Sequence, residues 1–206
     1  MASTPDTALP QLILASASTA RAMLLRQAGI DFIAVPADID EAAIKRTYLT
    51  GESDVTACAH ALAEAKAKAI AALYPDALVV GADQILVADG KWFDKPRDLS
   101  EAAEQLRCLR GREHRLVTAC CVCQAGTVLW RALSSPILTM RQFGEAFLAR
   151  YIAAEGDAVL GSVGAYRLEG RGVQLFARIE GDHFAILGLP LLELLGFLRE
   201  RHVMGD

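Results

Sequence analysis

The sequence predicts a mixed α/β protein, and two observations carry that prediction. Short apolar runs of strand length alternate along the chain with longer segments of helical periodicity. The 206 residues are 53% hydrophobic, with a mean hydropathy of +0.28, which is enough for one substantial core or for two lobes that share a cleft. Because no repeat, low-complexity tract or linker divides the chain, we expect a single α/β unit with mixed strands.

The expected strands are apolar runs bounded by turn residues. They are placed at residues 11–15, 32–36, 77–80, 85–88, 116–124 and 128–138, with one more ending at Ile179. Asp89-Gly90 is a good hairpin signal, and Ala125-Gly126 joins the two strands on either side of it.

The expected helices have periodic apolar residues and recognisable ends. One follows Ser18 and ends at Gly29, and the others are placed at residues 55–73, 99–110, 144–153 and 190–201. Asp98 and Glu101 fit a capping box, and Gly111 closes the helix that they begin.

The stretch Gly81-Ala82-Asp83-Gln84 lies at the centre of the apolar pattern. A carboxylate such as Asp83 within an apolar strand costs free energy unless a partner satisfies it. The small residues before it leave room for a ligand or for another backbone to approach closely. Turn amides alone can satisfy such an aspartate, so the stretch leaves a structural and a functional interpretation open.

A second candidate site is the hydroxyl-rich turn that begins at Ser16, between the first strand and the first helix. A helix N-terminus binds anions, and Arg21 adds a positive charge in the first turn. The turn lacks the glycine and lysine of a Walker loop. Simple capping of the helix by Ser18 or Thr19 is the more economical interpretation.

Three acids within four residues, Asp38, Asp40 and Glu41, precede a further helix. They either compensate the helix dipole or hold a divalent cation, which prefers clustered carboxylate oxygens. Lys66 lies on the helix at residues 55–73, where the pattern favours a solvated surface charge.

Composition argues against several classes of protein. A net charge of −4 gives no overall attraction for a nucleic-acid backbone, and no apolar run approaches the roughly 18 residues of a membrane span. We therefore expect neither nucleic acid nor a membrane as a partner. Residues 1–10 are interpreted as a flexible tail without the features of a secretory signal, ahead of a single domain at residues 11–206.

The five cysteines lack the spacing of a zinc site. Cys121 and Cys123 are expected to share one strand face, with Cys120 on the other. We interpret the five as buried, reduced thiols of a cytoplasmic protein.

The order of the motifs resembles a known family. The motifs are Leu14-Ala-Ser16-Ala-Ser18 with Arg21, Asp38-Ile-Asp40-Glu41, Ala63-Glu-Ala-Lys66, Gly81-Ala-Asp83, Lys95-Pro96, Leu109-Arg-Gly111-Arg112-Glu-His114, Gly164-Ala-Tyr166, Glu169-Gly170 and Gly188-Leu-Pro190. Each is weak alone, but together they resemble the Maf family of nucleoside triphosphate pyrophosphatases, also called septum formation proteins, from Leu12 to about Leu198.

The resemblance implies a fold and a reaction. The fold is an elongated mixed α/β structure with a cleft between two lobes, similar to that of inosine triphosphatases. The reaction is hydrolysis of a nucleoside triphosphate to the monophosphate and pyrophosphate with Mg²⁺ or Mn²⁺. The family is also associated with arrest of cell division, and a homodimer is one assembly that we expect.

The resemblance also implies roles for particular residues. Asp83 is similar to the proton acceptor of the family, and Lys66 and Lys95 match its active-site lysines. Ser16 and Arg21 match phosphate-binding positions, while Glu41, together with Asp83, is expected at the metal. The chemistry is consistent, because attack of water on a phosphoanhydride needs a carboxylate for the water and cations around the charged oxygens.

The family usually carries two consecutive arginines here. This sequence has Ala20 in place of the first and keeps the second as Arg21. Ala20, Gln84 and Glu169 match three specificity positions, which carry Arg, Thr and Gln in the branch that hydrolyses dTTP and UTP. Gln84 and Glu169 resemble instead the branch that acts on 7-methyl-GTP. We therefore expect 7-methyl-GTP to be preferred.

Three other functions remain as alternatives. The same cleft can hold a nucleotide for regulation without turning it over, although a binding module needs no general base at Asp83. A preference for dTTP and UTP is the second alternative. A nucleic-acid binder is the third, and the lack of interleaved basic and aromatic residues disfavours it.

Overall fold

A computed structural model describes residues 11–49 and 54–204, so the expected tail at residues 1–10 lies outside the described residues. Within those ranges, eight strands form one sheet in the order β2-β1-β3-β5-β7-β8, with β4 paired to β3 and β6 paired to β5. The strands are β1 (Leu12–Leu14), β2 (Ile33–Ala34), β3 (Leu78–Ala88), β4 (Lys91–Phe93), β5 (Glu113–Gln124), β6 (Thr127–Ser134), β7 (Ile137–Met140) and β8 (Phe176–Glu180).

The sheet is mixed, as predicted. Strand β1 is parallel to β2 and β3, whereas β3, β5, β7 and β8 pair as antiparallel neighbours. The helices are α1 (Thr19–Gln27), α2 (Glu41–Leu49), α3 (Val55–Ala71), α4 (Leu99–Leu109), α5 (Glu145–Glu155), α6 (His183–Ile186) and α7 (Leu191–Glu200), with 3₁₀ segments η1 (Gly156–Gly161), η2 (Val163–Ala165) and η3 (Arg171–Leu175).

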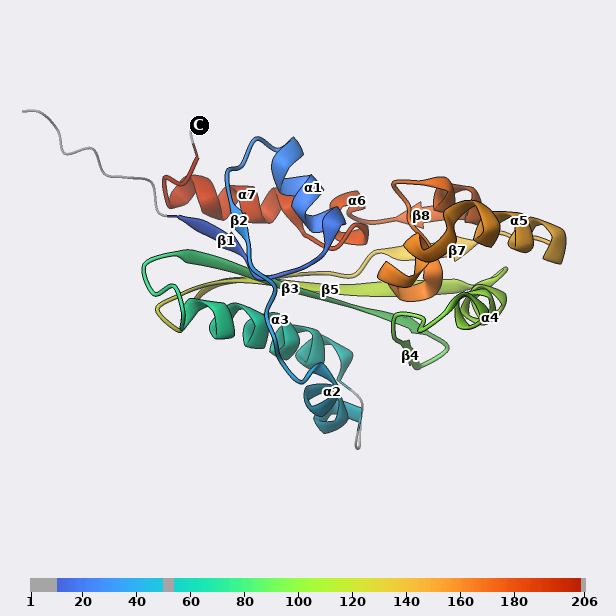
Figure 1. Ribbon diagram of the computed structural model, residues 1–206, viewed down its shortest axis with the longest axis horizontal. Coiled ribbons are helices and arrows are strands. Elements are labelled where there is room, and N and C mark those ends of the chain that lie inside the picture. The colour runs from blue at the N-terminus through green and yellow to red at the C-terminus, as the bar shows by residue number, and fades with distance from the viewer. Residues whose placement is uncertain (1–10, 50–53, 205–206) are drawn as a thin grey trace, which may run out of the picture.

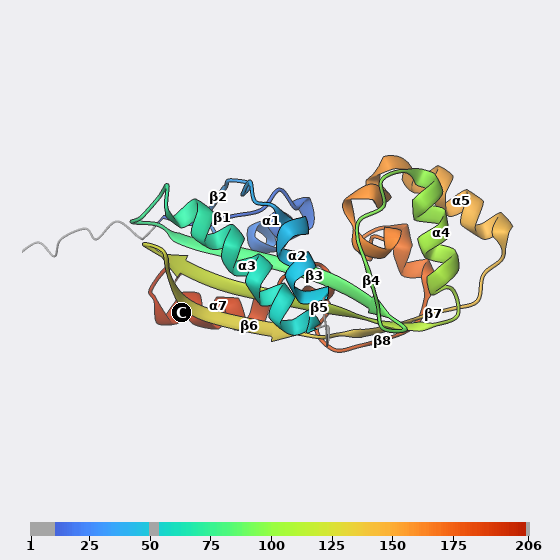
Figure 2. The ribbon, with the colours of Figure 1, turned by 90° about the horizontal axis from the view of Figure 1, so that it is seen from below.

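The molecule is elongated and has two lobes (Figure 1). In the first lobe, α3 covers one face of the sheet, and α1 and α7 cover the other. The second lobe contains α4, α5 and the 3₁₀ segments around β7 and β8. The long strands β3 and β5 run through both lobes (Figure 2), so the lobes share one continuous sheet.

Strand alternation decides which core each residue enters. On β5, Cys121 and Cys123 pack under α3, while Cys120 packs with α1 and α7, as expected. Asp83 lies in the α3-facing set of β3, and Gln84 points to the opposite face. This alternation separates the two functional candidates that adjoin in sequence.

Three predictions need correction. The runs at residues 77–80 and 85–88, predicted as separate strands, belong to one continuous strand, β3, because the residues between them also pair with β5. The run at residues 128–138 is two strands, because Pro136 lacks an N–H for the ladder and the chain passes from β6 to β7 along the same edge of β5. Asp98 caps α4 by accepting from the Glu101 N–H, but the Glu101 carboxylate accepts from the N–H of Arg97. The reciprocal bond of the capping box is thus shifted by one residue.

In the part of the chain that the structure describes, none of the helices has the length and apolarity needed to span a bilayer.

Candidate active site

A cleft of about 880 Å³ lies between the two lobes, beside the middle of β3. Residues from both lobes line it. The residues that the family resemblance assigned to the site all lie along its wall: Ser16, Ala20, Arg21, Glu41, Lys66, Asp83, Gln84, Lys95 and Glu169. Folding therefore gathers positions that are far apart in the chain around one cavity.

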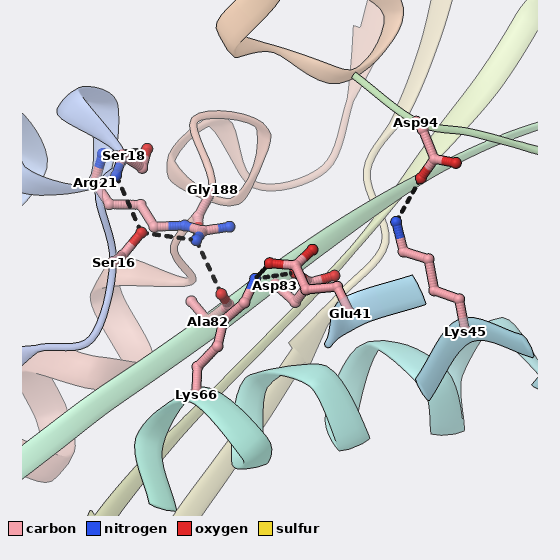
Figure 3. A network of polar contacts seen from close by, with 10 residues as sticks. All are labelled: Ser16, Ser18, Arg21, Glu41, Lys45, Lys66, Ala82, Asp83, Asp94 and Gly188. Carbon is pink, nitrogen blue, oxygen red and sulfur yellow. Dashed lines mark hydrogen bonds and ion pairs between the residues drawn. The ribbon is translucent and has the colours of Figure 1, made fainter. Parts of the chain in front are cut away.

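Asp83 lies deep in this cleft and is 6% exposed. Lys66 of α3 donates a hydrogen bond to Asp83 Oδ1 at 2.6 Å (Figure 3). Gly81 makes this contact reachable, because a Cβ at residue 81 would lie 2.2 Å from the backbone oxygen of Ala63 in α3. The glycine lets the helix approach the strand so closely that its lysine reaches the buried carboxylate.

Glu41 begins α2 and is the second carboxylate on Lys66, at 2.8 Å. Burial raises the pKa of Glu41, but the hydrogen bond and the charge of Lys66 outweigh burial and hold the pKa below its ordinary value. Asp40 accepts from the N–H of Ala43 and caps α2, whereas Asp38 does not line the cleft. A capping role and a cleft carboxylate thus coexist in this acidic cluster.

The Arg21 guanidinium connects three segments of the first lobe. It donates from Nη1 to Ala82 O at 2.9 Å and to Ser16 Oγ at 3.2 Å, and from Nε to Gly188 O at 2.9 Å (Figure 3). Ser18 accepts from the Arg21 N–H and caps α1, as predicted. Burial lowers the pKa of Arg21. Since its partners are neutral oxygens rather than a paired carboxylate, this cation favours an incoming anion.

Lys95 follows β4 and lines the cleft without a hydrogen bond to Asp83 among the described residues. The residue is exposed overall, yet the cleft walls desolvate its ammonium and lower its pKa, and repulsion by Arg21 and Lys66 lowers it further. Glu41 and Asp83 oppose this shift. Binding of a polyanion would relieve the repulsion.

The side-chain amide nitrogen of Gln84 already forms hydrogen bonds within the protein. Its Nε2 donates to Thr118 Oγ1 at 2.8 Å and to the carbonyl oxygens of Ala185 and Ile186 at 2.8 and 3.2 Å. These bonds fasten α6 to the sheet and so hold the segment that carries Gly188. Its Oε1 has no hydrogen bond within the described residues.

Glu169 lies on the second lobe's side of the cleft. Arg167 donates to Glu169 Oε1 at 3.3 Å and to Glu155 at 3.4 Å, so one guanidinium serves two carboxylates. Gly172 allows the loop to fold back on this arginine, because a Cβ there would lie 2.4 Å from Arg167 O. Ala20 lines the same cleft from the start of α1.

Tyr166 forms part of the cleft wall, and a buried histidine holds its hydroxyl in place. Its hydroxyl lies 2.9 Å from Nε2 of His114, which is 3% exposed. Burial lowers the pKa of His114 to about 4, so the imidazole is neutral at physiological pH. The pair therefore positions the aromatic wall without adding charge.

Several cleft residues escaped the sequence analysis, namely Lys45, Arg46, Asp94 and Arg167. Lys45 was detectable, because it follows Glu41 by one helical turn and therefore shares its face of α2. Asp94 adjoins Lys95 but gave no periodic signal.

The cleft has a different charge balance from the whole chain. Among the described lining residues, six are basic and four acidic: Arg21, Lys45, Arg46, Lys66, Lys95 and Arg167 against Glu41, Asp83, Asp94 and Glu169. The chain itself carries −4. A local excess of positive charge in a cleft concentrates anions there.

No group of three or more His, Cys, Asp and Glu side chains in a metal-binding arrangement occurs among the described residues. Asp83 and Glu41 are nevertheless two carboxylates that meet at one lysine. Mg²⁺ is usually held by one or two carboxylates together with substrate phosphates and water, so this pair fits such an ion.

The fold and the site define a two-lobed α/β protein whose cleft is suited to a polyanion. The Maf-like protein family model matches residues 11–201, and the chain belongs to this family.

Three relatives illustrate the similarity. A nucleoside triphosphate pyrophosphatase of Granulibacter bethesdensis is 52% identical over 194 residues, which cover 94% of this chain and 98% of that protein. A 7-methyl-GTP pyrophosphatase of Rhizobium etli is 48% identical over 193 residues, or 93% and 96% of the two chains. A nucleoside triphosphate pyrophosphatase of Paramagnetospirillum magneticum is 50% identical over 188 residues, or 91% and 97%.

Proposed function

We propose that this protein hydrolyses nucleoside triphosphates to the monophosphate and pyrophosphate. The observation that carries the proposal is the buried Asp83 carboxylate, held by Lys66 at 2.6 Å in a cleft with excess positive charge. The names and the extent of similarity of the relatives support the same reaction.

In the proposed reaction, Asp83 accepts a proton from the attacking water. The water oxygen bonds to the α-phosphorus, the bond from that phosphorus to the bridging oxygen breaks, and pyrophosphate leaves with the electron pair. Lys66 orients the carboxylate through their ion pair. Arg21 and Lys95 stabilise the charge on the phosphate oxygens, because both are cations without an ion-pair partner in the described residues.

A divalent cation, Mg²⁺ or Mn²⁺, belongs to the proposal. Asp83 and Glu41 would hold it, and when bound it would neutralise phosphate charge. Removal of divalent ions with EDTA is expected to abolish turnover, and added Mg²⁺ or Mn²⁺ to restore it. Full activity in EDTA would contradict this part.

For the base, we favour 7-methyl-GTP over dTTP and UTP. Glu169 presents a carboxylate that can accept from the N–H edge of guanine, and its negative charge favours a methylated, positively charged base. Gln84 has Oε1 left for a ligand, while its amide nitrogen is occupied. A relative with 48% identity carries the name 7-methyl-GTP pyrophosphatase, which supports the same choice.

The test is a panel of 7-methyl-GTP, GTP, dTTP and UTP with Mg²⁺ or Mn²⁺. Turnover is followed by chromatography of the nucleotide products and by phosphate release after inorganic pyrophosphatase is added. We expect monophosphate and pyrophosphate as products and the highest kcat/KM for 7-methyl-GTP. Nucleotide binding without any hydrolysis would favour the regulatory module, and a clear preference for dTTP and UTP would overturn the base assignment.

Cytoplasmic location and a homodimer also belong to the proposal. The five cysteines are all free, which is the usual state in a reducing compartment, although Cys108 is exposed and not buried as expected. Within the described residues β6 pairs with β5 alone and exposes Leu133, and such an edge can receive a second copy. Light scattering on the purified protein measures its molar mass and so distinguishes a homodimer from a monomer.

A further inference from the structure

Helix α2 forms one wall of the cleft, although none of its residues is buried. Ile44 and Tyr48 pack towards the core beneath α3. The adjoining face contributes Glu41, Ala42, Lys45, Arg46 and Leu49 to the cleft. The spacing of these five places them on adjacent turns of one helical face, so the helix presents two cations to any ligand in the cleft.

Lys45 is held by a partner in the other lobe. Its Nζ lies 2.5 Å from Oδ1 of Asp94, which precedes Lys95 after β4 (Figure 3). The Lys45 side chain is 21% exposed and that of Asp94 is 75% exposed. Gln105 of α4 donates to the Asp94 carbonyl oxygen at 3.0 Å and so fixes the backbone that presents this carboxylate.

The electrostatic surroundings place Lys45 within range of the reacting groups. Burial lowers its pKa, but the hydrogen bond and charge of Asp94, reinforced by Asp83 and Glu41, outweigh burial and raise the pKa above its ordinary value. The lysine therefore remains charged at neutral pH.

A mostly exposed carboxylate is a weak partner for such a cation, because water competes for it and exposed ion pairs contribute little. A phosphate oxygen carries more charge and forms stronger charge-assisted hydrogen bonds. The flexible four-carbon stem of lysine allows its ammonium to change partners.

We propose that Lys45 binds the phosphates of the pyrophosphate leaving group and that Asp94 occupies the same ammonium as an internal competitor until substrate arrives. This inference rests on the proposed function and adds a substrate-binding residue to it. Its consequence is that the two partners of one ion pair have opposite effects on affinity.

The test measures the Kd of inorganic pyrophosphate by isothermal titration calorimetry at constant ionic strength, which needs no turnover. Lys45→Met is expected to weaken binding about tenfold or more, and Lys45→Arg to retain most of it. Asp94→Asn is expected to tighten binding about two- to fivefold. In the double variant the gain from Asp94→Asn is expected to vanish.

Matched controls come from an ion pair outside the cleft. Lys68 and Glu64 of α3 lie 2.9 Å apart, Glu64 also pairs with Arg131 at 2.7 Å, and neither Lys68 nor Glu64 lines the cavity. Lys68→Met and Glu64→Gln make the same changes in net charge, and we expect each to leave the Kd within about twofold, because charges outside the cleft are screened by salt.

Other outcomes overturn the inference. If the pair is only a strut between lobes, both single variants change the Kd in the same direction. If Asp94→Asn tightens pyrophosphate binding equally in the Lys45→Met background, the Asp94 carboxylate only repels the polyanion and does not compete for Lys45. A wild type that binds no pyrophosphate also refutes it. If the variants show the expected pattern but the wild type hydrolyses no nucleotide, the proposed function is refuted, and only the binding of phosphate by Lys45 in competition with Asp94 stands.

Discussion

The two ends of the cleft are built differently. At the proposed catalytic end, Asp83 is buried on a central strand and meets Lys66 at 2.6 Å, and Gly81 lets helix α3 approach the strand closely. At the proposed base end, Glu169 is exposed in a turn and meets Arg167 at 3.3 Å. The proposed chemistry requires fixed geometry and lies on regular elements, while the proposed selectivity residue lies where it can change without disturbing the core.

The largest effect is expected at the catalytic end from Asp83→Asn, which keeps the shape and removes the basicity. Turnover is expected to fall by about 10²–10⁴ while nucleotide binding survives, as is typical for loss of a general base. Steady-state kinetics and calorimetry measure the two quantities. Asp31→Asn, at an exposed aspartate outside the cleft, is the control. Near-normal turnover of Asp83→Asn would remove the assignment.

Gly81→Ala tests the close packing that supports this end. Because the added Cβ would collide with backbone atoms of α3, we expect a loss of about 1–3 kcal/mol in the free energy of unfolding. Urea denaturation measures it. Gly196→Ala in α7 meets nothing within 4 Å and is expected to stabilise by up to about 1 kcal/mol. Equal effects at both positions would contradict the packing explanation.

Glu169→Gln tests the base end. We expect the ratio of kcat/KM for 7-methyl-GTP to that for dTTP to fall about tenfold, because loss of the carboxylate charge that faces the base costs roughly 1–3 kcal/mol. The melting temperature is expected to stay unchanged, in contrast to Gly81→Ala. Glu200→Gln on the exposed end of α7 is the control. An unaltered ratio would show that selectivity lies elsewhere.

The smallest expected effect concerns Lys95. A lysine whose pKa is lowered in the folded state binds fewer protons there than in the unfolded chain, so stability rises with pH between the lowered and the ordinary pKa. At neutral pH the folded protein bears the full cost of this charge. Lys95→Met is therefore expected to raise Tm by about 1 °C without nucleotide while turnover falls. Scanning calorimetry at pH 7 measures the Tm, and a lower Tm of Lys95→Met would contradict the explanation that the Lys95 charge destabilises the folded protein.

Much of the fold follows from local signals. The alternation of apolar runs predicts the strands, Ser18 and Asp98 cap helices α1 and α4, and Gly111 has the positive φ expected at a helix end. The sequence contains Pro136, which interrupts strand pairing. The apolar residues on both sides of it nevertheless led to the prediction of one continuous strand.

By itself the sequence marked Asp83 as a residue that needs a partner, because an acid among small and apolar strand residues is costly to bury alone, and the family resemblance added Lys66 and Lys95 as candidates. Only the tertiary structure decided the partners: that Lys66 takes both Asp83 and Glu41, that Lys45 crosses to Asp94, and that Arg167 pairs with Glu155 of α5. The physical reason is that ion pairs between segments depend on how closely helices, strands and lobes pack. That spacing depends on contacts such as those of Gly81 and Gly172, and only the structure shows which backbone approaches each glycine: that of Ala63 at Gly81 and that of Arg167 at Gly172.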